Sequence, residues 1–105
     1  MTRYSNRREE TALIDCRIDR QSFVPVYQQI KNWLMHKIKL GELSDGDVIP
    51  SEAQLSEALR VSRAPVRQAL YELRIAGYIV REKGRGTFVE MSATRQRSYL
   101  VDSTN

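Results

Sequence analysis

The first patterned stretch of the chain alternates apolar and polar residues. In LIDCRID, residues 13–19, the apolar residues Ile14, Cys16 and Ile18 alternate with polar ones. Such alternation is typical of a strand with one buried face, and we predict a short strand over 13–19. Cys16 would lie on its inner face, so it is interpreted as a small buried hydrophobic residue rather than a reactive thiol.

Helical spacing replaces the alternation after Pro25, a residue suited to the first turn of a helix. Apolar residues recur three and four apart as far as Leu40: Val26, Tyr27, Ile30, Trp33, Leu34 and Ile38. Gly41 provides a helix stop, and SDGD, residues 44–47, is typical of a turn. The pattern therefore predicts one amphipathic helix ending before Gly41.

Two shorter helices are predicted next, separated by a tight turn at Arg60 and Val61. Ser51 is placed to cap the first, with Gln54 in position for a capping box. Ser62 is placed to cap the second, and Pro65 falls in its first turn, where no N–H is needed. The predicted buried positions are Leu55, Ala58 and Leu59 in the first helix, and Val66, Ala69, Leu70 and Leu73 in the second, which stops at Gly77.

A β-hairpin is predicted after these helices, with strands over 78–81 and 87–89 around GRG, residues 84–86. The element order predicts a mainly α fold with a small β-wing: a winged helix-turn-helix of three helices, a C-terminal hairpin and a short N-terminal strand. A chain of 105 residues fits one such domain. We expect a flexible arm over 1–12, the domain over 13–90, and a tail or linker to a further C-terminal domain over 91–105.

Positive charge is concentrated in one segment. The net charge of the chain is +4, but residues 60–89 carry +5 and the remainder −1. Surface arginines usually form only a solvated face, whereas their concentration in one segment indicates a nucleic-acid partner.

The second residue pattern that favours nucleic acid is SRAPVRQAL, residues 62–70. Arg63 and Arg67 lie one turn apart, on the face opposite the apolar stripe. At a helix start that is already positive they gain nothing for stability, but they would suit a polyanion. In a helix-turn-helix the N-terminal residues of the second helix meet bases and phosphates in the major groove. The other candidates there are Ser62 for a phosphate, Ala64 and Pro65 for a thymine methyl, and Gln68 for adenine or simply for solvent.

The hairpin tip adds Lys83 and Arg85, with Gly84 allowing close approach of the backbone. A glycine pair in a hairpin is usually only a turn, and GRG is too short for a phosphate loop. Beside a basic recognition helix, we interpret it as a wing laid against the DNA backbone or minor groove.

Other function classes find little support. The chain has one histidine and one cysteine, so no catalytic residues, metal site or cofactor is expected. No apolar run is long enough to span a membrane, and the charged N-terminus lacks a signal-peptide core. We expect a cytoplasmic protein that is not an enzyme.

Four motifs in combination resemble a known family: P-x-Y-x-Q-I, G-E-L-x-x-G-D-x-I-P-S-E, V-S-R-x-x-V-R-x-A-L and G-R-G-T-F-V. From Val24 to Val89 the chain resembles the N-terminal winged helix-turn-helix domain of the GntR family of bacterial transcription regulators. It looks most like the HutC- and YtrA-type branches.

The resemblance implies a sequence-specific DNA-binding domain of a regulator, most often a repressor. It also implies residue roles: Ser62, Arg63 and Arg67 fall on family positions that contact operator bases and phosphates. Gly84 falls on the wing-tip glycine, Thr87 lies in the G-T-F motif, and Ser51 belongs to the Pro-Ser-Glu before the second helix.

The chain departs from the family pattern in two ways. Ala53 stands where the family often has an arginine that contacts DNA. The chain also ends about 15 residues after the wing, whereas family members usually carry a C-terminal domain that binds an effector and makes most dimer contacts. Because that domain lies outside this chain, we expect no effector site within these residues. Palindromic recognition by two half-sites needs a dimer, so we expect double-stranded operator DNA with two-fold symmetry as the partner and a homodimer at least on DNA.

A docking module that has lost DNA binding is the main alternative. Winged helices serve as protein-interaction modules, and Ala53 fits relaxed DNA contacts. A docking module would tend to replace Arg63, Arg67 and Arg85, and this chain keeps all three.

Overall fold

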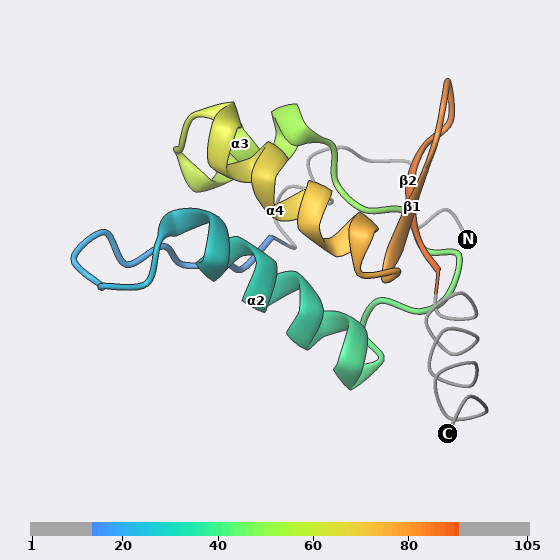
Figure 1. Ribbon diagram of the computed structural model, residues 1–105, viewed down its shortest axis with the longest axis horizontal. Coiled ribbons are helices and arrows are strands. Elements are labelled where there is room, and N and C mark those ends of the chain that lie inside the picture. Colours follow the sequence, from blue (N-terminus) through green and yellow to red (C-terminus); the bar gives the residue numbers. More distant parts are fainter. Residues whose placement is uncertain (1–13, 91–105) are drawn as a thin grey trace.

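The computed structural model describes residues 14–90, as three helices followed by a two-stranded hairpin (Figure 1). The helices are α2 (Val26–Leu40), α3 (Glu52–Leu59) and α4 (Arg63–Ile75), and the antiparallel strands are β1 (Ile79–Glu82) and β2 (Gly86–Val89). This architecture confirms the predicted winged helix-turn-helix. The predicted arm over 1–12 and tail over 91–105 lie outside the described residues.

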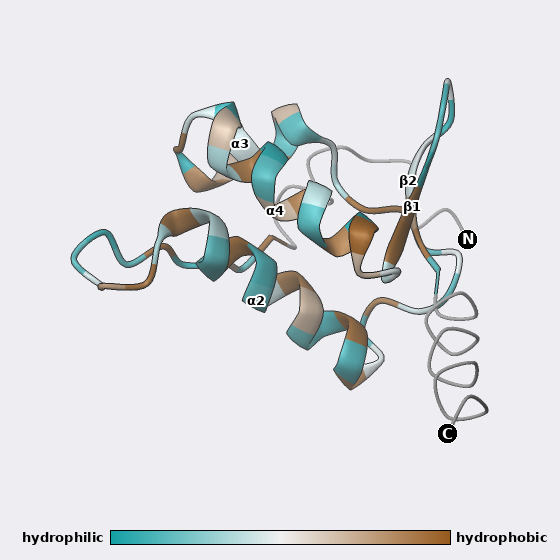
Figure 2. Cartoon of the chain, viewed as in Figure 1, coloured by the Kyte–Doolittle hydropathy of each residue, from teal (hydrophilic) through white to brown (hydrophobic). Residues whose placement is uncertain are grey.

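Helix α4 is the central element, because α2, α3 and β1 all pack against it. Burial of the apolar stripes predicted from the sequence drives this arrangement. Ala58 and Leu70, both predicted to be buried, are only half-buried. In Figure 2 the base of the hairpin is apolar and its tip is hydrophilic. The buried core consists of Ile30, Leu34, Ile38, Ile49, Leu55, Leu59, Val66, Ala69, Leu73, Ile79 and Val89.

The predicted N-terminal strand is wrong, because residues 14–19 form no β-structure. The alternation still reports burial correctly: Ile14, Cys16 and Ile18 are half-buried against the core, and the residues between them are exposed. Period-two burial needs only an extended segment lying on a surface, whereas a strand also needs a hydrogen-bonding neighbour. Burial raises the pKa of the Cys16 thiol to about 11, with the Asp15 charge adding to the effect, so the thiol stays protonated.

The β-partner that sequence analysis missed lies in the segment before α3. Val48 forms an isolated bridge with Phe88 of β2. The backbone N–H of Ile49 donates to the Thr87 carbonyl at 2.7 Å, and that of Val89 donates to the Asp47 carbonyl at 2.9 Å. These bonds fasten the wing to the chain leading into α3, so they fix the wing relative to both helices of the helix-turn-helix.

The helix termini largely follow the predicted caps. Ser51 and Gln54 form the capping box, with the Gln54 N–H donating to Ser51 Oγ at 3.1 Å and the Ser51 N–H donating to Gln54 Oε1 at 2.8 Å. Ser62 occupies the N-cap position of α4, but its hydroxyl makes no capping hydrogen bond. Gly77 ends α4 at φ 91°, as its glycine character predicts.

The turn between α3 and α4 holds a strained residue. Arg60 adopts φ 58° and ψ 48°, and it is the one non-glycine residue with positive φ among residues 14–90. Arg20 Nη2 donates to its carbonyl at 2.6 Å, which anchors the turn from the N-terminal segment. The conformation is set by the turn, not by the arginine side chain.

Replacing Arg60 therefore has opposite expected effects depending on the substitute. Arg60→Gly should raise the free energy of unfolding by up to about 1 kcal/mol, because glycine adopts positive φ without strain. Arg60→Val should lower it by about 1–2 kcal/mol, because β-branching worsens the strain. Urea denaturation of both variants measures this; equal shifts would show that Arg60 carries no backbone strain.

Candidate nucleic-acid interface

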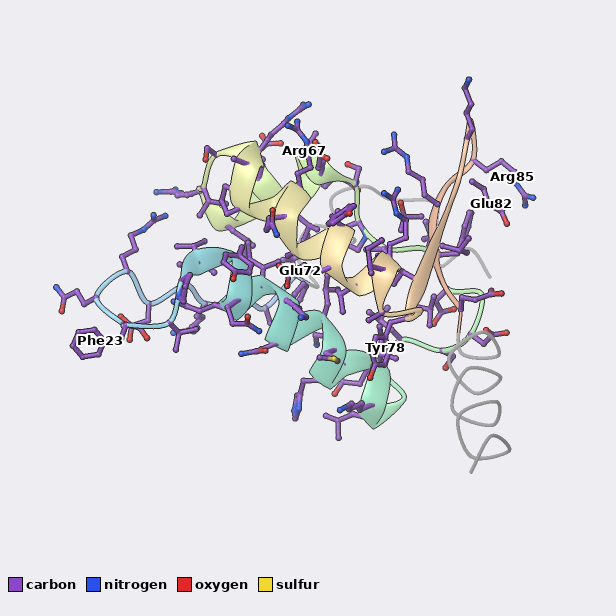
Figure 3. All side chains as sticks on the ribbon, in the orientation of Figure 1. Phe23, Arg67, Glu72, Tyr78, Glu82 and Arg85 are labelled. Carbon is purple, nitrogen blue, oxygen red and sulfur yellow. The ribbon has the colours of Figure 1, made fainter. Side chains whose placement is uncertain are left out.

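An open cleft of about 740 Å³ lies between the wing and the helix-turn-helix. One carboxylate, that of Glu52, lines it, together with five arginines: Arg63, Arg67, Arg74, Arg81 and Arg85. In Figure 3, Arg67 projects on the side of α4 away from α2, where the start of α3 lies, and Arg85 projects from the wing. The structure thus gathers basic side chains from α4 and the wing around one hollow.

Helical and strand periodicity place these side chains. Arg63, Arg67, Tyr71 and Arg74 follow one another at spacings of four, four and three along α4, so they share one face. In β1, Ile79 and Arg81 are two residues apart and both line the cleft. Thr87 pairs with Arg81 across the hairpin and also lines it.

Arg67 forms a two-pronged ion pair with Glu52. Its Nε donates to Oε2 and its Nη2 to Oε1, each at 3.2 Å. The hydrogen bonds and charge of Glu52 raise the pKa of Arg67. The sequence did not reveal this partner, which lies opposite Arg67 in the first turn of α3. The Arg67 side chain is 64% exposed, so the ion pair adds little to stability, and the expectation that this arginine gains nothing for stability stays a prediction.

The wing arginine is also paired. Arg85 Nη1 lies 3.0 Å from Glu82 Oε1, and its guanidinium lies over the Phe88 ring, 5.7 Å from the centroid. Lys83 and Gly84 lie at the exposed wing tip, outside the cleft lining. A Cβ on Gly84 would meet nothing within 4 Å, so its φ of 79°, not lack of space, favours glycine there.

The remaining candidates divide between the cleft and its surroundings. Ser51 and Thr87 line the cleft, as does Ala53, where the family often has arginine. Ser62 and Ala64 are exposed at the start of α4, and Pro65 is half-buried there; none of the three lines the cleft.

Gln68 contacts Glu72 and does not line the cleft. Its Nε2 donates to Glu72 Oε2 at 2.7 Å, and Lys31 Nζ of α2 donates to Glu72 Oε1 at 3.1 Å. These two bonds, that of Gln68 first, lower the pKa of Glu72. In Figure 3, Glu72 lies between α4 and α2. In this structure Gln68 therefore joins the contact between α4 and α2, and its adenine contact stays a prediction.

Among the charged and aromatic residues that line the cleft, sequence analysis did not assign four to the site: Glu52, Tyr71, Arg74 and Arg81. The spacing from Arg67 marks Tyr71 and Arg74, whose guanidinium lies over the Tyr71 ring at 5.6 Å. No local signal marks Glu52, which is 15 residues from its partner. Within residues 14–90, no carboxylate pairs with Arg63, Arg74 or Arg81.

A second hollow of about 310 Å³ lies between α2 and the segment before α3, lined mainly by apolar residues such as Ile14, Trp33 and Leu43. The expectation that this chain holds no effector site stays a prediction. Among the described residues no cluster of three or more His, Cys, Asp or Glu side chains is placed to hold a metal ion. None of the described helices has the length and apolar character of a membrane span.

The sequence matches a known family model. Residues 26–89 match the model described as "Bacterial regulatory proteins, gntR family". The chain is 44% identical over 79 residues to the HTH-type transcriptional repressor NagR of Bacillus subtilis (strain 168), covering 75% of this chain and 32% of the relative. The chain spans between 14% and 34% of the length of eight curated relatives that it matches.

Solved structures share the fold. YtrA from Sulfolobus acidocaldarius, a GntR-family transcription factor, aligns with a TM-score of 0.70 and 31% identity, over 85% of this chain and 94% of that one. The AraR DNA-binding domain in complex with operator ORX1 aligns with a TM-score of 0.61 and 33% identity, over 63% of this chain and 80% of that one.

Proposed function

The chain belongs to the gntR family of bacterial regulatory proteins and carries its winged helix-turn-helix DNA-binding domain, and from this premise we propose how it binds. Helix α4 enters the major groove of a two-fold symmetric operator, and the wing lies on the flanking backbone or minor groove. Two copies of the chain bind the two half-sites, and the regulator acts as a cytoplasmic repressor.

The observation that carries this proposal is the cleft, where five arginines face one carboxylate between the recognition helix and the wing. A polyanion held there would release counterions from each neutralised phosphate. Arginine also pairs bidentately with guanine. The same face of α4 thus offers both the phosphate contacts that position the domain and the base contacts that specify sequence.

The remaining site residues take supporting roles in this proposal. Ser62, whose hydroxyl makes no cap bond, donates to a phosphate beside Arg63. Ala64 and Pro65 contact bases at the groove floor, while Lys83, Gly84 and Arg85 follow the backbone from the wing tip. Ala53 removes one contact, and Arg81 and Arg74, which pair with no carboxylate within residues 14–90, supply charge on the same cleft.

Dimerisation and regulation extend the proposal beyond these residues. The chain covers 32% of NagR, a transcriptional repressor. In this proposal, binding of the domain to its operator blocks transcription. The effector binds to a further domain, which is joined to this one through residues 91–105.

Selection of bound duplexes from a random pool tests the proposal. Enrichment of a two-fold symmetric motif would support paired binding, and a single half-site would leave sequence reading intact while removing the dimer. Weak, salt-sensitive binding with no enriched motif would overturn sequence-specific binding and favour the docking module.

A further inference from the structure

The interface contains an acidic side chain where a polyanion should dock. Glu52 is the one carboxylate among residues 14–90 that lines the cleft, and its side chain is 26% exposed. The start of α3 favours a negative charge through the helix dipole, but an uncharged residue would fit that position without repelling phosphates. Its two-pronged bond to Arg67 points to a role in presenting that arginine.

The atoms engaged in this bond determine which donors remain. A guanidinium has five N–H donors: one on Nε and two on each of Nη1 and Nη2. Glu52 takes the Nε donor and one donor of Nη2. The terminal edge, formed by Nη1 and the second Nη2 donor, makes no hydrogen bond to any of residues 14–90. Two adjacent donors of this kind match O6 and N7 of guanine in the major groove.

We propose that Glu52 is a specificity-determining positioning residue, which holds Arg67 so that its terminal guanidinium edge pairs with a guanine. This inference rests on the proposed function. Because Glu52 and Arg67 together are neutral, a phosphate approaching Arg67 also meets the Glu52 charge and gains little. Arg63, one turn earlier and without a carboxylate partner in residues 14–90, keeps its full attraction for phosphate.

The Glu52→Gln variant tests the inference against a matched control. Glu57→Gln makes the same charge change on the same helix, at an exposed position outside the cleft lining. For Glu52→Gln, we expect affinity for random duplex to rise several-fold, with a salt slope steeper by about 0.9. We also expect discrimination against a substituted guanine in the selected site to fall about tenfold. Glu57→Gln should leave discrimination unchanged.

A second variant separates charge from geometry. Glu52→Asp keeps the negative charge but is one methylene too short for the same two-pronged bond. It should lose guanine discrimination without gaining affinity for random duplex. Circular dichroism of each variant verifies the fold, and Glu52→Asp replaces Glu52→Gln as the test should the latter unfold.

A double-mutant cycle with Arg67→Ala isolates the positioning role. Without Arg67, Glu52→Gln should no longer alter guanine discrimination, because nothing remains to be positioned. A persisting effect would show that Glu52 contacts a base itself, and this would overturn the inference. Equal discrimination by the parent and Glu52→Gln on an enriched motif would overturn the inference alone, whereas absence of any motif for the parent would overturn the proposed function with it.

Discussion

Replacing Arg63 and Arg67 together with alanine should reduce affinity for the selected operator by about 30-fold or more. An arginine paired with a guanine, as proposed for Arg67, contributes about 1–3 kcal/mol of discrimination, and Arg63 adds a phosphate contact. Both side chains project from the exposed face of α4, opposite its buried stripe. Affinity for random duplex should fall less. Fluorescence anisotropy with operator and scrambled duplexes at several salt concentrations measures both quantities.

The loss should reflect the interface and not the fold. Arg67 takes part in one exposed ion pair and Arg63 in no ion pair within the described residues, so the thermal midpoint of the double variant should stay near that of the parent. Lys83→Ala is the matched control at the wing tip, because its proposed contact is a phosphate. It should weaken binding to all duplexes evenly and reduce the salt slope by about one unit. If the double variant binds operator as the parent does, α4 is not the recognition helix.

Local chemistry was enough to predict the helices and the hairpin. Helical spacing predicted α2, the Ser51–Gln54 capping box predicted the start of α3, and Gly77 predicted the end of α4. Each of these signals acts within a few residues of chain. The predicted strand over 13–19 failed because pairing requires a partner, and the β-partner of the wing, Val48, lies in a segment without any strand pattern.

In the candidate site too, local sequence signals did not predict contacts between separate elements. Charge and spacing along one helix predicted Arg63 and Arg67, and the same spacing extends to Tyr71 and Arg74. The cleft depends on the approach of α3 and the wing to α4, which brings in Glu52 and Arg81 from other elements. The sequence predicts that Arg67 projects outward from α4, but only the fold shows that a carboxylate already holds two of its donors.

Leu73→Ala should have the largest effect on stability. Leu73 is fully buried in the last turn of α4, the element against which α2, α3 and β1 pack. Truncating a buried leucine lowers the free energy of unfolding by about 2–5 kcal/mol through lost apolar contact and the cavity left behind. In a domain of this size each kcal/mol shifts the thermal midpoint by about 4–8 °C. Circular dichroism melting measures the shift, and a change below about 1 kcal/mol would contradict this placement of the core.

Leu70→Ala is the control, because Leu70 is half-buried at the edge of the same stripe and lines the cleft. Leu70→Ala should lose less stability than Leu73→Ala, since the structure around Leu70 can relax toward solvent.

Operator DNA links this experiment to function, because a ligand that binds only the folded state adds about 2.7 kcal/mol to the free energy of unfolding when its concentration is a hundredfold above Kd. Operator should therefore reverse much of the drop in thermal midpoint caused by Leu73→Ala, because this variant keeps the residues of the cleft. The reversal should be far smaller if Arg63 and Arg67 are also replaced.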